Sequence, residues 1–373
     1  MEILTARPTP DPNTSPAKKL DDLSITRVPV AAEEGRNLGQ MLNLVFFPIQ
    51  IALKIIFGPH RDVVMCSTAP QVTLGFAVSV AAKIRRTKFI YHCMDLHPEI
   101  GQISGEFANP IVRRVFSAMD LATMRRATRI IVLSEDMRAA TINRDQNLAS
   151  KLLVINNFAL PDFEPHPQSS PIAAPKDGTL RIVFTGNLGR FQGLETAVNA
   201  LHLIPPGKPV ELVLMGQGKA ERELKKAARS LPNCAHINVT FIPQGSPAEA
   251  KALMREAHLG LVSLTPGVVR FAYPSKTATY AREALPLLVA CEQDSQLARM
   301  VREQNLGLTV PPGDAAAMAE AFNQARERLT TDGIPAWKSA ITEYSEVAFD
   351  ESNVLDCWSE LINELDENRK FAQ

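Results

Sequence analysis

The sequence predicts an α/β protein built from two domains of similar size that face a cleft. Three observations lead to this fold class. Short, continuously apolar segments alternate with helical ones, which is typical of parallel sheets covered by helices on both faces. The alternation runs twice along the chain, and a proline-rich segment at 161–178 separates the two series. A length of 373 residues is enough for two domains, each with its own core.

The first series predicts the N-terminal domain. Its expected strands are short and rich in apolar residues, and they fall at 63–67, 88–93, 129–134 and 151–156. Segments with helical spacing are found at 73–84, 110–126 and 135–142. Strands that alternate with helices in this way indicate βαβ units, so we expect a parallel sheet.

The most apolar window of the chain, 41–57, precedes these strands. It contains Pro48, Gln50 and Lys54, and it is shorter than the ~20 apolar residues that a membrane-spanning helix requires. We therefore expect a helix that is either buried or lies on a membrane surface.

The second series predicts the C-terminal domain. Its expected strands, with helices between them, fall at 180–185, 210–215, 239–242, 259–264 and 287–290. The final segment, 350–371, is rich in helix formers and predicts a helix that packs across one or both domains. The predicted organisation is an N-terminal domain 1–165, a linker 166–178, a C-terminal domain 179–345 and a terminal helix 346–373.

Charge and cysteine content exclude several classes of protein. The chain has 40 Lys+Arg and 40 Asp+Glu, and this zero net charge argues against a nucleic-acid-binding surface. Its five cysteines are scattered, with no C-x-x-C pair, which excludes zinc ribbons and thioredoxin-type motifs. Reduced thiols and the absence of a signal sequence in residues 1–20 indicate a cytoplasmic protein.

Two glycine-containing loops follow expected strands of the second series. TGNLGR (185–190) places Gly186 and Asn187 before a helix that begins near Leu194. Glycine lets the backbone approach a ligand closely, free N–H groups at a helix start suit an anion, and Arg190 can pair with a phosphate. The alternative is an ordinary turn with a solvated arginine. MGQG (215–218), which contains Gly216, is a weaker signal for a base or ribose site.

Two further segments carry polar groups at strand ends. YPSKT (273–277) predicts a helix capped by Ser275 with Lys276 beside it, which suits a diphosphate; a capped surface helix is the alternative. DLHPE (95–99) places Asp95 where it can contact sugar hydroxyls or act in acid–base chemistry, unless it is simply a polar loop. We expect His92, inside the preceding strand, to be a packed core histidine.

Taken together, these motifs resemble the retaining glycosyltransferases of family 4, above all the bacterial enzymes that build cell-surface polysaccharides on lipid carriers. The likeness runs from about residue 1 to residue 345. It is most specific in FTGNLGRFQGLETAVNAL (184–201), LVLMGQGKAERELKKAA (212–228), YPSKTATYAREALPLLVA (273–290) and SQLARMVREQNLGLTVPPGD (295–314). DLHPE is similar to the D-x-W-P-E loop of these enzymes, and 129–157 to the end of their N-terminal domain.

The resemblance implies the GT-B fold, in which two Rossmann-like domains face a cleft. It implies a nucleotide-diphosphate sugar, such as a UDP-sugar, held mainly by the C-terminal domain, and an acceptor on the N-terminal domain. Transfer would retain the anomeric configuration and need neither a metal ion nor another cofactor, because basic residues and a helix N-terminus neutralise the leaving diphosphate.

The resemblance also implies roles for individual residues. Gly186 and Asn187 would face the diphosphate, and Arg190 would take the place of a phosphate-binding basic residue. Ser275 and Lys276 would head the helix that meets the phosphates. The remaining donor-site positions are Gly216 and Gln244 at the nucleoside, and Thr279. Asp95 would be the catalytic residue. It would lie where the N-terminal domain meets the donor sugar and the acceptor.

This chain departs from the family pattern in three ways. Residues 1–10 look like the second strand of such an enzyme, so the first strand, its glycine-rich loop and the first helix are expected to be missing. Phe271 and Thr279 stand where the family often has two glutamates, and Leu285 replaces a glycine. Met94 stands where many members have a histidine before the aspartate.

The leading hypothesis is a glycosyltransferase that moves a sugar to a lipid-linked or polysaccharide acceptor in cell-envelope glycan synthesis. The 41–57 helix would then rest on the cytoplasmic face of the membrane, where a nearby basic cluster attracts anionic lipid. That cluster consists of Lys83, Arg85, Arg86 and Lys88. The alternatives are a catalytically inactive glycosyltransferase-like scaffold and, less favoured by the GNLGRFQGLE and PSK segments, a nucleotide-sugar 2-epimerase.

Overall fold

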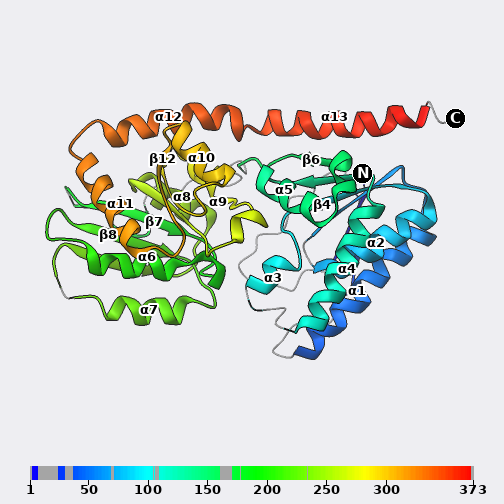
Figure 1. Cartoon of the computed structure of the whole chain (residues 1–373), viewed down its shortest axis with the longest axis horizontal. Helices are drawn as coiled ribbons and strands as arrows, with labels where there is room; N and C mark the ends of the chain where they lie inside the picture. The colour runs from blue at the N-terminus through cyan, green and yellow to red at the C-terminus, as the bar shows by residue number, and fades with distance from the viewer. Residues whose placement is uncertain are drawn as a thin grey trace. The chain divides into compact units, whose positions relative to one another are not determined.

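Figure 1 shows a computed structural model of the chain, which describes residues 2–6, 24–29, 37–68, 71–103, 105, 109–159, 170–176, 178–232 and 234–370. The chain divides into two compact units. The N-terminal unit consists of Met1–Val132 with Arg138–Val154, and the C-terminal unit of Leu133–Met137 with Ile155–Gln373. Of the predicted linker 166–178, residues 166–169 and 177 lie outside the described residues.

The N-terminal unit contains a four-stranded parallel sheet in the order β3-β4-β5-β6. Its strands are β3 (Val63–Ser67), β4 (Lys88–Cys93), β5 (Arg129–Val132) and β6 (Leu152–Val154). All four lie where the apolar segments predict them. Phe89, Ile90, Tyr91 and Cys93 of β4 are buried, as expected for a strand inside a sheet that is covered on both faces.

A separate pair of parallel strands, β1 (Glu2–Ala6) and β2 (Ser24–Val28), lies near the N-terminus. Sequence analysis missed β2, because SITRV contains only two apolar residues. Whether a strand and helix of the family pattern are missing from this domain stays a prediction.

The helices of the N-terminal unit follow the predicted segments closely. They are α1 (Asn37–Phe57), α2 (Gln71–Arg85), α3 (Glu99–Ile103), α4 (Pro110–Arg126) and α5 (Glu135–Arg144). Helix α4 begins where its sequence requires, because the Asn109 side chain accepts hydrogen bonds from the N–H groups of Ile111 and Val112 and Pro110 occupies the first turn. No helix among the described residues is both long enough and apolar enough to cross a membrane.

The C-terminal unit contains a six-stranded parallel sheet in the order β12-β11-β10-β7-β8-β9. Its strands are β7 (Leu180–Thr185), β8 (Val210–Met215), β9 (Ile237–Ile242), β10 (Leu259–Ser263), β11 (Leu287–Ala290) and β12 (Gly307–Val310). Sequence analysis missed β12, whose four residues include a glycine and a threonine. The strand order reverses between β7 and β10, and open α/β sheets bind ligands at such a switch point.

The α-helices in the described part of the C-terminal unit begin with α6. They are α6 (Leu194–Ala200), α7 (Glu221–Arg229), α8 (Pro247–Arg255), α9 (Lys276–Arg282), α10 (Gln296–Glu303), α11 (Ala315–Arg328), α12 (Gly333–Ala348) and α13 (Glu351–Lys370). Helix α12 continues through the predicted domain boundary at 345. Helix α13 covers nearly all of the segment 350–371 that predicts a terminal helix.

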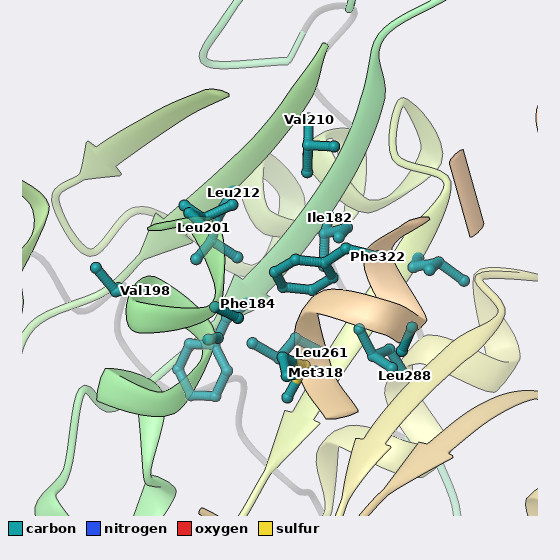
Figure 2. Close-up of a cluster of buried hydrophobic side chains, with 14 of the residues drawn as sticks. Ile182, Phe184, Val198, Leu201, Val210, Leu212, Leu261, Leu288, Met318 and Phe322 are labelled. Carbon is teal, nitrogen blue, oxygen red and sulfur yellow. The ribbon is translucent and has the colours of Figure 1, made fainter. Parts of the chain in front are cut away.

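One face of this sheet packs against α6 and α11 to form the main hydrophobic core. Figure 2 shows Ile182 and Phe184 of β7 and Leu261 of β10 beside Met318 and Phe322 of α11. All five side chains are fully buried. This core fixes the strands whose carboxyl ends carry the candidate site.

Truncating Phe322 to alanine is expected to destabilise the C-terminal unit by about 3–5 kcal/mol, because the change removes buried apolar surface and leaves a cavity. Denaturant-induced unfolding measures the loss. Leu203→Ala is the matched control, since 55% of Leu203 is exposed, and it should cost about 0.5 kcal/mol or less. Equal effects of the two substitutions would contradict the assignment of the core.

Candidate functional site

A cavity of about 860 Å³ opens at the carboxyl ends of β7, β8 and β9 in the C-terminal unit. Its volume lies within the roughly 300–1,000 Å³ that is usual for small-molecule sites. Three strand-to-helix loops line it. The lining residues are Thr185, Gly186, Asn187, Met215, Gly216, Gln217, Gly218, Lys219, Gln244, Gly245, Ser246, Pro247 and Ala250.

The first two of these loops are in direct backbone contact. The Gly186 N–H donates to the Met215 carbonyl at 2.8 Å, and the Gly216 N–H donates to the Ile242 carbonyl at 2.9 Å. Gly216 has φ +150°, and a Cβ at this position would lie 1.8 Å from the Gly186 carbonyl oxygen. Only glycine allows this approach.

Two further hydrogen bonds hold the loops together beyond the glycines. The Leu188 N–H donates to the Gln217 carbonyl at 2.9 Å, and the Ala220 N–H donates to the Leu188 carbonyl at 2.9 Å. Leu188 is buried, whereas Gly186 and Asn187 are exposed. The wall of the cavity is therefore a fixed strip of backbone, ready to meet a ligand without rearrangement.

Lys276 brings a positive charge to this wall. A Cβ built on Gly186 would lie 3.3 Å from Lys276 Cε, so the lysine side chain passes directly beside the loop. Its Nζ lies 4.6 Å from the centre of the Phe184 ring, which favours the ammonium form. Burial lowers the pKa of Lys276 to about 8, so the group is still mainly cationic at pH 7.

The third loop begins helix α8 with a complete capping box. Ser246 Oγ accepts a hydrogen bond from the Glu249 N–H at 3.2 Å, and Glu249 Oε2 accepts one from the Ser246 N–H at 2.7 Å. This second bond is the main reason why the pKa of Glu249 is lowered. Sequence analysis singled out Gln244 but missed the S-P-A-E capping signature that fixes the loop.

The structure brings four of the eight predicted donor-site residues into the cavity lining and leaves four outside it, of which Lys276 lies beside Gly186. Gly186, Asn187, Gly216 and Gln244 all line the cavity. Arg190, Ser275 and Thr279 do not: Arg190 is exposed in the short 3-10 helix Arg190–Gln192, and Thr279 is half-buried in α9.

Ser275 is the N-cap residue of α9, as predicted, but its side chain makes no capping hydrogen bond. Its φ of −57° and ψ of −22° are helical. A side chain caps a helix from an extended backbone conformation, so the expected cap is lost.

Asp95 follows β4 in the N-terminal unit, as expected. It is half-buried, and its N–H donates to Thr68 Oγ1 at 3.1 Å. Burial raises the pKa of Asp95, which makes its carboxylate a stronger proton acceptor than an exposed one. His92 is half-buried in β4, and burial lowers its pKa to about 4, so it is neutral at pH 7.

A buried ionic network that sequence analysis missed holds the loop after Asp95. Arg144 of α5 donates to Asp120 at 2.7 Å, to the His97 carbonyl at 3.1 Å and to Glu99. Tyr91 Oη donates to Asp120 at 2.7 Å. Because the partners come from β4, α3, α4 and α5, no local sequence pattern reveals them.

The described residues include no cluster of three or more His, Cys, Asp or Glu side chains that is suited to a metal ion. The C-terminal unit offers a preformed cavity, glycine backbone and the cations of Lys219, in the cavity lining, and Lys276, beside Gly186. This combination is suited to an anionic ligand that carries a larger, partly apolar group.

Comparisons with known proteins agree with this chemistry. Residues 179–327 match the family described as glycosyl transferases group 1. The chain is 26% identical over 333 residues to the probable glycosyltransferase WbjE of Pseudomonas aeruginosa, covering 87% of this chain and 80% of that protein. It is 20% identical over 354 residues to the putative colanic acid biosynthesis glycosyl transferase WcaI of Escherichia coli K12, covering 92% and 82%.

Solved structures share the fold. Anabaena Alr3699/HepE in complex with UDP-glucose is 17% identical, with a TM-score of 0.67, over 98% of this chain and all of that one. The same protein with UDP and glucose gives a TM-score of 0.68 at 16% identity, again over 98% of this chain and all of that one. This likeness extends over both units and identifies the fold as GT-B-like.

Replacing Gly216 with alanine is expected to destabilise the C-terminal unit, because the new Cβ overlaps the Gly186 carbonyl and the backbone conformation is unfavourable for it. The loss should exceed about 1 kcal/mol in thermal or denaturant unfolding. Gly178→Ala is the matched control: Gly178 also has a positive φ, of +76°, but a Cβ there meets nothing within 4 Å. If both substitutions cost the same, the contact between the loops is not what requires glycine.

Proposed function

This chain belongs to the group 1 glycosyltransferases, and on that basis we propose that it transfers a sugar from a UDP-sugar to a lipid-linked or polysaccharide acceptor, with retention of anomeric configuration. The reaction would serve cell-envelope glycan synthesis, in keeping with the name of the relative WcaI. The observation that carries the proposal is the cavity at the ends of β7–β9 with Lys276 beside its glycine wall. The choice of UDP rests on the nucleotides bound to Alr3699/HepE.

The donor is proposed to lie along the carboxyl ends of the strands of the C-terminal unit. The nucleoside would occupy the cavity between Gly216 and Gln244, where Met215, Pro247 and Ala250 supply apolar surface. The diphosphate would then lie against Gly186 and Asn187, within reach of the Lys276 ammonium. A half-buried cation beside a glycine loop is suited to stabilise the negative charge that develops on a departing diphosphate.

Arg190, Ser275 and Thr279 are proposed to act outside the cavity, on the diphosphate and the donor sugar. Arg190 follows the glycine loop directly, so a long and exposed side chain starts close to the proposed phosphate position. Asp95 is proposed to meet the reacting sugar and the acceptor hydroxyl. Its raised pKa suits a group that exchanges a proton with a hydroxyl during the reaction.

UDP binding, measured by isothermal titration calorimetry, tests the donor site. Lys276→Ala is expected to weaken binding by about 10- to 100-fold, the value of a hydrogen bond to a charged group. In the wild type, affinity should fall as the pH rises through about 8, because Lys276 then loses its proton. UDP itself stays fully charged over this range, since the second phosphate pKa is about 6.

Lys208→Ala serves as the control for the removal of one positive charge. Lys208 is exposed and precedes β8, so it lies at the amino ends of the strands, whereas the cavity lies at their carboxyl ends. Binding of UDP, GDP, dTDP and ADP is compared in the same way. A chain that binds none of them, or binds UDP equally well without Lys276, would refute the proposed donor site.

Helix α1 carries an apolar surface that we propose rests on the cytoplasmic face of the membrane and brings the enzyme to lipid-linked acceptors. The exposed fractions of Phe46 and Phe57 are 56% and 81%. Val45, Ile49 and Leu53 are also exposed, and the spacing of the five places them along one side of the helix. Exposed Lys54 of α1, Lys83 of α2 and Arg86, directly after α2, add positive charge, which attracts anionic lipid.

Co-sedimentation with vesicles of phosphatidylcholine and phosphatidylglycerol tests this surface. We expect the wild-type chain to sediment with the vesicles, less so as salt is raised, because salt screens the charges. Phe46→Glu/Phe57→Glu should stay in the supernatant, whereas Leu203→Glu, an exposed position of the C-terminal unit, should behave as the wild type. Equal sedimentation of all three chains would argue against the α1 surface.

A further inference from the structure

The edge of β7 that faces β10 is only partly paired with that strand. β7 and β8 are paired over six residues, from Leu180 to Thr185, whereas β7 and β10 are paired only at Ile182 and Val183. Backbone N–H groups point alternately to the two sides of a strand. Since the Gly186 N–H is bonded to β8, the Thr185 N–H points toward β10, beyond the last pair of that ladder.

A side chain replaces β10 as the partner of Thr185. The hydroxyl of Tyr280, on α9, accepts the Thr185 N–H at 3.1 Å. Thr185 itself lines the cavity. At the other end of β7, a side chain again serves as the partner of a backbone N–H group: the Arg181 N–H donates to His258 Nδ1 at 3.0 Å.

A glycine in the neighbouring strand β10 leaves space for the Tyr280 ring. Tyr280 is fully buried, and a Cβ on Gly260 of β10 would lie 2.5 Å from its ring. A glycine in the middle of a strand weakens the strand and often marks a close approach by another group. Burial raises the pKa of Tyr280 to about 12, so the phenol keeps its proton at physiological pH.

Tyr280 lies one helical turn after Lys276 in α9. One helix thus supplies both the cation beside Gly186 and the hydroxyl that fixes the preceding residue, Thr185. We infer that Tyr280 is a positioning residue for the donor diphosphate: its hydroxyl sets the position of the Thr185–Gly186 backbone relative to Lys276. This inference rests on the proposed donor site. The role of Tyr280 is distinct from that of any residue that touches the nucleotide.

Tyr280→Phe removes the hydroxyl and keeps the ring. With a buried N–H left unsatisfied and the loop no longer held, we expect UDP to bind about tenfold more weakly at a temperature where the variant is fully folded. Thermal unfolding without ligand, measured in parallel, establishes that temperature. Tyr344→Phe, a half-buried tyrosine of α12, is the matched control and should bind UDP as the wild type does.

A double-mutant cycle with Lys276→Ala separates positioning from stability. If Tyr280 places the loop against Lys276, the loss from Lys276→Ala should be several-fold smaller in the Tyr280→Phe background than in the wild type. Additive losses, or a lower melting temperature with unchanged UDP affinity, would overturn the inference.

Gly260→Ala provides a second variant should Tyr280→Phe fail to fold. It keeps the hydroxyl and displaces the ring, so it should weaken UDP binding in the same way; unchanged affinity would overturn the inference. A wild-type chain that binds no UDP would instead refute the proposed function, so the two failures are distinguishable.

Discussion

The close approach of two strand-to-helix loops in the C-terminal unit is the constraint on which the candidate site depends. The Gly186 carbonyl occupies the space that a side chain at position 216 would need. This contact, and the hydrogen bonds that flank it, join the ends of β7, β8 and β9 into one rigid wall. A wall made of backbone keeps a fixed shape, which avoids the cost of ordering flexible side chains when a ligand binds.

Charge at the site is local, whereas the chain as a whole is neutral. Lys276 is the cation that the structure places against the glycine wall, and its burial has two consequences. Burial makes the ammonium costly to keep in the free protein, which lowers its pKa, and it also removes the solvent that would screen its attraction for a phosphate. The apolar part of the site and the cation are thus adjacent but belong to different strands: the cavity lies over β7–β9, and Lys276 follows β10.

The fold could largely be predicted from the sequence because parallel strands buried on both faces appear as continuous apolar segments. Leu180–Thr185, Val210–Met215 and Leu287–Ala290 are strands with the predicted bounds. β2 and β12 were missed because they are short and partly polar, so pairing with a neighbour rather than their own composition defines them. Glycines at strand ends likewise indicated the loops at 186 and 216, since a close backbone approach requires that residue.

The sequence could not reveal which residues converge. The sequence predicts both Arg190 and Lys276 as phosphate ligands, but Arg190 is exposed, whereas Lys276 is half-buried beside Gly186. The expected Ser275 cap does not form, because the backbone at that residue is helical rather than extended. The bond between Tyr280 and Thr185 and the network around Arg144 join residues that are distant in sequence, and no spacing rule reports such contacts.

A crystal structure of the chain with UDP would show whether the glycine wall and Lys276 together hold the diphosphate of a nucleotide donor. We expect the diphosphate to lie within hydrogen-bond distance of the Gly186–Asn187 backbone and of Lys276 Nζ, with the nucleoside between Gly216 and Gln244. Electron density for UDP at another place, or none at a saturating concentration, would contradict this expectation.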